Sequence, residues 1–411
     1  MARSRFRLSV VIPVWNGWDL TEACLRSLAE HTPGDDFQVV LADNGSTDQT
    51  PTAAPALGQT LFGDSFLHHR LPGNLGFAKA CNAGAKAASA AYLFFLNNDT
   101  RVTENWLPPL MDGLRADRRL AGVGPLLLFP EDDSVRAGRV QHLGIAVADN
   151  MEFRHLYEYF PPSHPAVLRR RTFSVITAAA LLMPTPLFHA HNGFHEGFVN
   201  GMEDVDLCCR IAQKGGRFSV VPQSIIHHHT HGTEGRFDHE SANLRLLRAR
   251  CRDAREDFCG LLREDGFEPG LTPWLDLAAQ LPEPRLAELN AGLDATRDAD
   301  RLSALLLQEP LWDQGHARLT ALLEQQGQPR EAMAVAYLRS LLCPGLDAFR
   351  ECTRLLRLCD IHRMADRYAA RLNALEHTLA DRDGLRKKAN SLLHTTRDDA
   401  VRRQIETFLA E

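Results

Sequence analysis

The chain has 411 residues, of which 44% are hydrophobic and 24% charged, and its formal net charge is −6. This length allows two domains, and the mild acidity argues against a general nucleic-acid-binding protein. The nine cysteines form no CxxC pair, which argues against a zinc site and a disulfide framework. No signal peptide or membrane-length apolar run is recognised, so we expect a cytoplasmic protein without a transmembrane segment, although peripheral contact with a membrane stays open.

The first 125 residues alternate between strand-like and helix-like segments. The apolar runs at 8–14, 37–42 and 92–96 predict strands. The leucine spacing over 20–28 and the alanine-rich stretch 77–91 predict helices. Such alternation is typical of an α/β protein with a mainly parallel sheet flanked by helices.

The character of the sequence changes twice after this point. Residues 126–175 are irregular, and we interpret them as an insertion or an acceptor-side loop. Beyond about residue 260 the strand signals vanish and leucine, alanine, arginine and glutamate recur at helical spacing. We therefore predict an α/β domain over residues 1–258 and an all-α domain over residues 259–411.

The second domain contains a weak internal repeat. Ala332 matches Ala365 and Ala336 matches Ala369, an offset of 33 residues. This spacing resembles tetratricopeptide-type helical hairpins, and a generic helical bundle is the alternative.

Polar side chains follow the predicted strands. Asn97, Asn98 and Asp99 end the third strand, and ligands of open α/β sheets bind at that edge. Asp43 ends the second strand in the same way. The alternative for both is a simple turn, because short polar side chains satisfy the backbone there. The glycine-rich turn 73–77 opens a helix and allows a ligand to approach the backbone.

The order of these motifs resembles that of the inverting glycosyltransferases of family 2, which adopt the GT-A nucleotide-sugar-binding fold. The resemblance covers roughly residues 6–255. It rests on five segments, namely 11–16, 43–48, 73–77, 97–99 and 203–206. The Gly-Asn-x-Gly-Phe variant of the third segment and the asparagine-rich triplet look most like the rhamnosyltransferase-like branch.

The resemblance implies roles for individual residues. Asp204 would be the general base, and Glu203 would orient the acceptor or the base; the alternative for both is a pair of carboxylates favoured at a helix N-terminus. Asp99 would bind Mn²⁺ or Mg²⁺, with His229 as the first and His228 as the second choice of histidine partner. The nucleotide-sugar would be bound by Pro13, Val14, Trp15, Asn16, Asp43, Asn74, Gly76, Lys79, Asn82, Asn97 and Asn98.

These roles predict a metal-dependent hexosyltransferase that uses a UDP- or dTDP-linked donor and a single displacement. Asparagine at 97 and 98 departs from the acidic triplet of the family and places the metal dependence in doubt. The acceptor is either a glycan or a protein or peptide, and the helical domain offers a surface for a peptide or for a homodimer. The alternative function is a catalytically weak scaffold that acts through its helical domain. A nucleotidyltransferase fits less well, because no glycine-rich basic loop follows the first strand.

Overall fold

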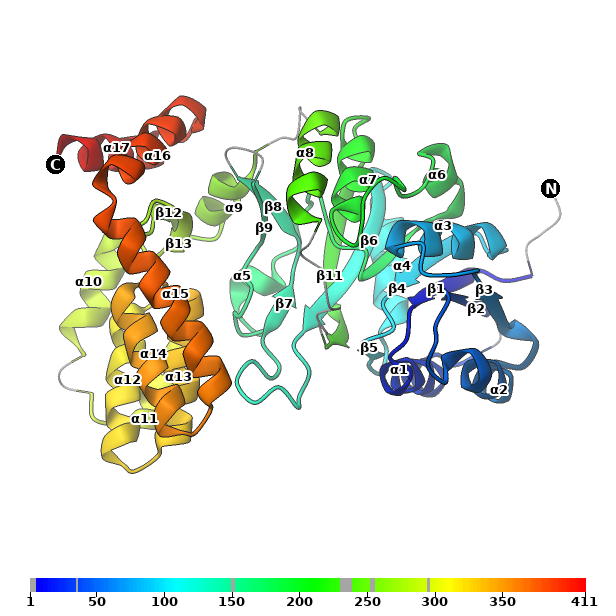
Figure 1. The fold of residues 1–411 in the computed structure, drawn as a ribbon, viewed down its shortest axis with the longest axis horizontal. Coiled ribbons are helices and arrows are strands. Elements are labelled where there is room, and N and C mark those ends of the chain that lie inside the picture. The colour runs from blue at the N-terminus through cyan, green and yellow to red at the C-terminus, as the bar shows by residue number, and fades with distance from the viewer. Residues whose placement is uncertain (1–4, 35, 149–151, 230–238, 252–255, 294–295) are drawn as a thin grey trace.

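The computed structural model describes residues 5–34, 36–148, 152–229, 239–251, 256–293 and 296–411. Figure 1 shows an α/β part that contains the first half of the chain and a helical part that contains the last third. Within the described residues, no helix combines the length and the apolar character that crossing a membrane requires.

A mixed sheet forms the centre of the α/β part. Among the described residues it has nine strands in the order β3-β2-β1-β4-β10-β6-β11-β5, with β7 paired to β6. Strands β3, β2, β1 and β4 run parallel, and β10 is antiparallel to both β4 and β6. The strands are β1 (Leu8–Val14), β2 (Phe37–Asp43), β3 (Phe66–Arg70), β4 (Tyr92–Leu96), β5 (Thr100–Val102), β6 (Leu120–Leu128), β7 (Val140–His142), β10 (Ala180–Pro184) and β11 (Arg217–His228).

Helices cover both faces of this sheet, which explains why its central strands are continuous apolar runs rather than alternating ones. Val10 and Ile12 of β1 pack in one apolar cluster with Leu25 of α1, whereas Val11 packs in another cluster with Cys81 of α3. The helices of this part are α1 (Trp18–His31), α2 (Thr50–Phe62) with the short η1 (Gly63–Ser65), α3 (Phe77–Ala87), α4 (Leu107–Ala116), α6 (Thr185–Ala190), α7 (Glu203–Ala212) and α8 (Glu240–Arg250). The α/β prediction is confirmed.

A second, two-stranded sheet stands between the two parts. Strand β8 (Ile145–Ala148) pairs with β9 (Glu152–His155), and the short helix α5 (Pro165–Leu168) follows. Figure 1 shows this hairpin beside the central sheet, on the side of the helical part.

The helical part begins with α9 (Phe258–Glu264) and a small hairpin. The prediction of an all-α domain is wrong for β12 (Glu268–Leu271) and β13 (Leu277–Gln280), which pair antiparallel. These four-residue strands contain proline, glycine and alanine, which are depleted in strands, so tertiary pairing rather than propensity determines them.

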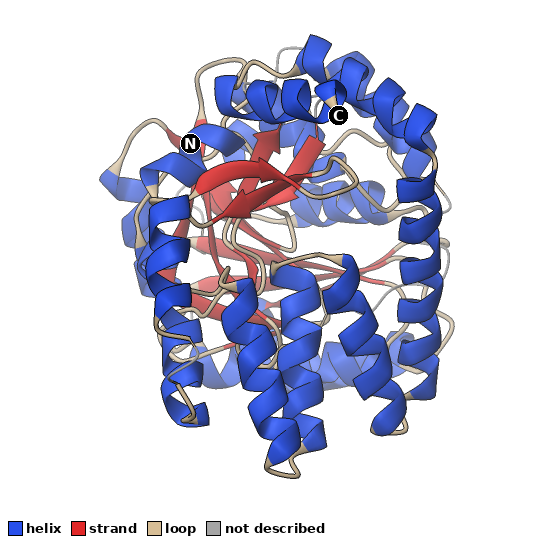
Figure 2. Cartoon of the chain, turned by 90° about the vertical axis from the view of Figure 1, so that its left-hand side faces the viewer, coloured by secondary structure: helices blue, strands red, loops and turns tan. Residues whose placement is uncertain are grey.

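The remaining chain is helical, and Figure 2 looks onto these helices with the strands behind them. The helices are α10 (Glu283–Ala291), α11 (Ala299–Gln308), α12 (Asp313–Gln325), α13 (Pro329–Leu342), α14 (Leu346–Leu358), α15 (His362–Ala380), α16 (Arg382–Thr395) and α17 (Asp399–Ala410). The 33-residue offset relates α13 to α15. Ala332, Ala336 and Ala365 are fully buried there against Leu355 of α14, which explains the small residues.

The apolar core continues across residue 258. The ring of Phe267 lies 5.6 Å from that of Tyr157 and 5.8 Å from that of Phe160. One cluster of buried residues joins these rings to Val11 of the central sheet and to Leu302 of α11.

Candidate active site

A cavity of ≈ 490 Å³ opens at the carboxyl ends of β1 and β4. Its walls come from these strand ends, from the segment that leads into α7, from β7 and from the β8–β9 hairpin. The cavity brings together ten of the residues that the sequence singles out, namely Pro13, Val14, Trp15, Asn74, Asn97, Asn98, Asp99, Glu203, Asp204 and His228.

The turn after β4 is held by hydrogen bonds that leave Asp99 on the cavity wall. Asn97 N donates to Ala179 O at 2.9 Å, and Thr100 Oγ1 donates to Asn97 O at 2.6 Å. Asn98 Nδ2 donates to Thr21 Oγ1 of α1 at 2.9 Å. Asparagine at position 98 therefore secures the turn to helix α1.

Asp99 faces His228 at the end of β11. Its Oδ1 lies 3.1 Å from His228 Nε2. His228 is fixed by Gln141 of β7, because Gln141 Nε2 donates to His228 O at 2.8 Å while Gln141 Oε1 lies 2.6 Å from His228 Nδ1. An amide oxygen only accepts, so Nδ1 of His228 carries a proton. In the neutral ring, Nε2 then presents a lone pair to the Asp99 carboxylate.

This arrangement fits a hard divalent cation. Asp99 Oδ1 and His228 Nε2 lie 3.1 Å apart on one wall of the cavity, and a carboxylate and a neutral imidazole can both bind a divalent cation. Buried Asn97 Oδ1 accepts no hydrogen bond from the described residues, and Asn97 Nδ2 lies 3.4 Å from His228 Nε2. Among the described residues, no group of three or more His, Cys, Asp and Glu side chains could hold a metal. Asp99 and His228 are the side chains of this wall that could contribute to holding a cation.

The structure reverses the predicted order of the two histidines. His228 is the last residue of β11 and its ring faces Asp99, whereas His229 follows the strand and donates its backbone N–H to Asp99 O at 2.9 Å. His229 is absent from the described cavity lining, and its Nδ1 lies 3.8 Å from Asp132 Oδ1. His231, in the same cluster, lies outside the described residues.

Asp204 lies in the first turn of α7, with its carboxylate oriented by three donors. Thr177 Oγ1 and Ala178 N donate to Oδ2 at 3.1 and 3.0 Å, and Val205 N donates to Oδ1 at 2.8 Å. Neighbouring Glu203 accepts from Gly201 N at 2.7 Å. Met202, just before the helix, has a φ of 70°, and this left-handed residue makes the sharp entry into the helix.

Two strand-end residues of the nucleotide prediction do not reach the cavity. Asp43 is fully buried, and its carboxylate accepts from Arg70 Nη1 at 2.9 Å and from Ser46 N at 2.8 Å. Its neighbour Asn44 lines the cavity instead. Asn16 Oδ1 accepts from Thr47 N at 2.7 Å and so serves the turn after β2.

Three residues of the next turn and helix also lie outside the described lining. Gly76 is the left-handed residue before α3, with a φ of 92°. Lys79 is half-buried on that helix. Asn82 Nδ2 donates to Phe194 O at 2.9 Å, and Asn82 Oδ1 accepts from Phe194 N at 3.0 Å, so Asn82 holds the loop before α7.

Sequence reasoning missed one wall of the cavity. Among the described residues this wall is formed by Gln141, His142, Ile145, Phe153, His155, Glu158 and Thr177. The first five of these lie on strands of three or four residues, which are too short for a period to be visible, and Glu158 and Thr177 lie outside any strand.

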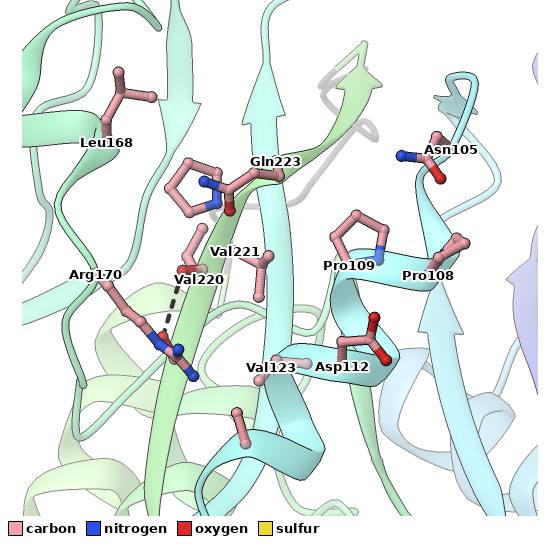
Figure 3. Close-up of a pocket in the computed structure, with 14 residues that line it drawn as sticks. Asn105, Pro108, Pro109, Asp112, Val123, Leu168, Arg170, Val220, Val221 and Gln223 are labelled. Atoms are coloured by element: carbon pink, nitrogen blue, oxygen red, sulfur yellow. Dashed lines mark hydrogen bonds between the residues drawn. The ribbon is translucent and has the colours of Figure 1, made fainter.

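A larger cavity of ≈ 670 Å³ has a different character (Figure 3). Its described lining includes three prolines and three valines, with Asp112 and Arg170 as the charged members, and none of it is shared with the first cavity. The carboxylates and imidazoles gather in the smaller cavity, which is therefore the candidate active site.

Comparison with known proteins agrees with this choice. Residues 9–176, which include Asp43, Asn74 and Asp99, match the family model "Glycosyl transferase family 2". The segment that matches this family makes up about two fifths of the chain. The matched segment thus carries the strand ends that form one side of the cavity, while Asp204 and His228 follow it in the sequence.

Relatives match about half of the chain. The O-antigen biosynthesis protein RfbC of Myxococcus xanthus is 30% identical over 237 residues, which are 54% of this chain and 17% of that protein. The pre-mycofactocin glycosyltransferase of Mycobacterium tuberculosis is 28% identical over 225 residues, which are 54% of this chain and 42% of that protein. The chain thus spans less than half the length of these relatives.

A crystal structure of GalNAc-T7 with UDP, GalNAc and Mn²⁺ is 19% identical, with a TM-score of 0.46, and covers 54% of this chain and 44% of that one. For Staphylococcus aureus TarS 1–349 the identity is 17%, the TM-score 0.44 and the coverage 86% and 89%.

Proposed function

We propose that this chain is an inverting glycosyltransferase that moves a sugar from a UDP- or dTDP-linked donor to a glycan or to a protein or peptide acceptor. The observation that supports this most is that Asp204 and the pair Asp99–His228 line one cavity. The rhamnosyltransferase-like branch stays a prediction.

The nucleotide would occupy the end of the cavity formed by β1 and the turns after β2 and β3. Trp15 is 43% exposed there and offers a flat apolar face to a nucleobase. The amides of Asn44 and Asn74 face the same space, and Asn44 Nδ2 donates to Asn74 Oδ1 at 2.8 Å. Amides both donate and accept, which suits the edges of a base and the hydroxyls of a ribose.

The reaction would be a single displacement. The acceptor nucleophile attacks the anomeric carbon while the bond from that carbon to the diphosphate oxygen breaks, and the bonding pair leaves with the diphosphate. The proton of the acceptor passes to Asp204, whose orientation is fixed by Thr177, Ala178 and Val205. Attack on the face opposite the leaving group inverts the anomeric configuration.

The charge of the cavity supports a cation. Asp99, Glu203 and Asp204 line it, and its described lining contains no lysine or arginine that could offset a diphosphate. Mn²⁺ or Mg²⁺, when bound by Asp99 and His228, would offset the charge that grows on the leaving diphosphate.

The test is a panel of UDP- and dTDP-sugars, assayed for donor hydrolysis and UDP affinity with and without Mn²⁺. We expect Asp204→Asn to lower turnover by at least about 100-fold while the Kd for UDP stays within about twofold. Asp99→Ala should weaken UDP binding only when Mn²⁺ is present.

The matched control is Asp112→Asn, which removes a carboxylate from the larger cavity and should change neither quantity. Equal loss of turnover and UDP affinity in Asp204→Asn would make Asp204 a structural residue and refute its role as the base.

A further inference from the structure

The β8–β9 hairpin turns a defined set of side chains toward the cavity. Phe153 and His155 are two residues apart on β9 and both line the cavity. Ile145, which pairs with His155 across the hairpin, lines it as well. The intervening Arg154 points away and donates to Leu277 O and to Glu152 Oε1. The alternation of the strand therefore separates a cavity side from an outer side.

A chain of hydrogen bonds joins this hairpin to Asp204. Thr177 Oγ1 donates to Asp204 Oδ2 at 3.1 Å, and Thr177 N donates to His142 Nε2 at 3.3 Å. His142 Nδ1 lies 3.0 Å from His155 Nδ1. The hairpin side of the cavity is thus three hydrogen bonds away from the candidate base.

The same chain fixes which nitrogens carry protons. A backbone N–H only donates, so Nε2 of His142 accepts and its proton is on Nδ1. Burial and the neighbouring His155 lower the pKa of His142 well below its usual range, in agreement with a neutral ring. His155 then accepts at Nδ1 and carries its own proton on Nε2. The cavity wall gains an oriented N–H donor.

The other groups of this wall suit neutral hydroxyls. Burial raises the pKa of Glu158 to about 7, so its carboxyl both donates and accepts near neutral pH. The described lining contains no lysine or arginine to receive a phosphate or carboxylate. The Phe153 ring offers an apolar face, against which the C–H groups of a pyranose pack well.

We propose that the β8–β9 hairpin forms the acceptor subsite and that the acceptor places a neutral pyranose ring there, against Phe153 and within reach of His155 and Glu158. This inference rests on the proposed glycosyltransferase function and narrows its acceptor to a carbohydrate without a charged group on the bound ring.

The experiment uses the 411-residue chain with Mn²⁺ and with UDP or dTDP. Calorimetry first measures the binding of each nucleotide, and the one that binds is used in the later steps. Saturation-transfer NMR then measures the binding of the methyl glycosides of glucose, galactose, N-acetylglucosamine and rhamnose, with methyl glucuronide as the charged analogue. We expect at least one neutral glycoside to bind and the glucuronide to bind at least about tenfold more weakly than methyl glucoside.

The variants locate the subsite. Phe153→Ala should weaken glycoside binding by at least tenfold with an unchanged Kd for UDP. Glu158→Gln should reduce the difference in affinity between methyl glucoside and methyl glucuronide. The matched control is Glu152→Gln, next to Phe153 on the outer side of the hairpin, which should leave glycoside binding unchanged.

The outcomes separate the two proposals. Failure of a folded protein to bind either UDP or dTDP would count against the glycosyltransferase itself. Nucleotide binding without any glycoside binding would overturn only the subsite and favour a peptide acceptor. Glycoside binding that Phe153→Ala leaves intact, or tighter binding of the glucuronide, would also overturn it.

Discussion

The contact between Gln141 and His228 gives the sharpest prediction. Replacing Gln141 with methionine keeps the volume of the side chain but removes its hydrogen bonds to His228 Nδ1 and His228 O. The proton of His228 is then no longer held on Nδ1, and its ring is free to rotate. Loss of a partner that orients a metal-binding histidine costs about 10- to 100-fold in metal affinity, or about 1.4–2.7 kcal/mol at 25 °C.

The assay is electron paramagnetic resonance of free Mn²⁺, titrated with protein in the presence of saturating UDP. We expect the Kd for Mn²⁺ to rise by 10- to 100-fold in Gln141→Met. The matched control is Gln38→Met, which removes a buried amide whose oxygen accepts from Ser9 and Ser89, far from the cavity lining. An unchanged Kd for Mn²⁺ in a folded Gln141→Met protein would refute the reasoning.

Two further predictions use paired variants. Gly45→Ala would place a Cβ 2.3 Å from the backbone of Gly73 and displace the turn that carries Asn74, so calorimetry should show at least a tenfold loss of UDP affinity. The control is Gly34→Ala, because Gly34 has a similar positive φ but no atom within 4 Å of the added Cβ. This control should lower the free energy of unfolding by about 1–2 kcal/mol and leave UDP affinity intact. Equal UDP affinities of the Gly45→Ala and Gly34→Ala proteins would refute the displacement of the turn that carries Asn74. Burial lowers the pKa of His316 to about 4. The unfolded chain therefore binds the proton more readily between about pH 6.5 and pH 4, and folding stability falls as the pH drops through this window, by about 2 kcal/mol from pH 7 to pH 5. Urea unfolding at pH 7 and pH 5 should show that the free energy of unfolding falls less in His316→Gln than in the wild type. In the exposed control His362→Gln it should fall as much as in the wild type. Equal falls in all three proteins would contradict the lowered pKa of His316.

The parts of the fold that the sequence predicts are those with strong local patterns. The runs that become β1, β2 and β4 are buried on both faces, and each ends in polar residues that stop the strand. Strands β1 and β4 are parallel neighbours and end at the same edge of the sheet, so Val14 and Asp99 both line the cavity.

The remaining parts depend on tertiary contacts. Strands β7, β8 and β9 are short and become strands through pairing, so the wall with Gln141 and His155 has no local signal. The choice between His228 and His229 depends on which face β11 turns to the cavity. Asp43 lies at the expected strand end, but its partner Arg70 comes from the next strand and keeps its carboxylate inside the protein.

The shared core around Phe267 has a consequence for work with shortened versions of this protein. Phe267 packs on Tyr157 and Phe160, just beyond the hairpin, and Arg154 of the hairpin donates to Leu277 O. A truncation at residue 258 would strip these supports from the hairpin while leaving the family 2 segment whole. Loss of transfer in such a fragment would therefore report a damaged enzyme rather than a missing docking module, and exchanging the two parts between homologues calls for a junction elsewhere.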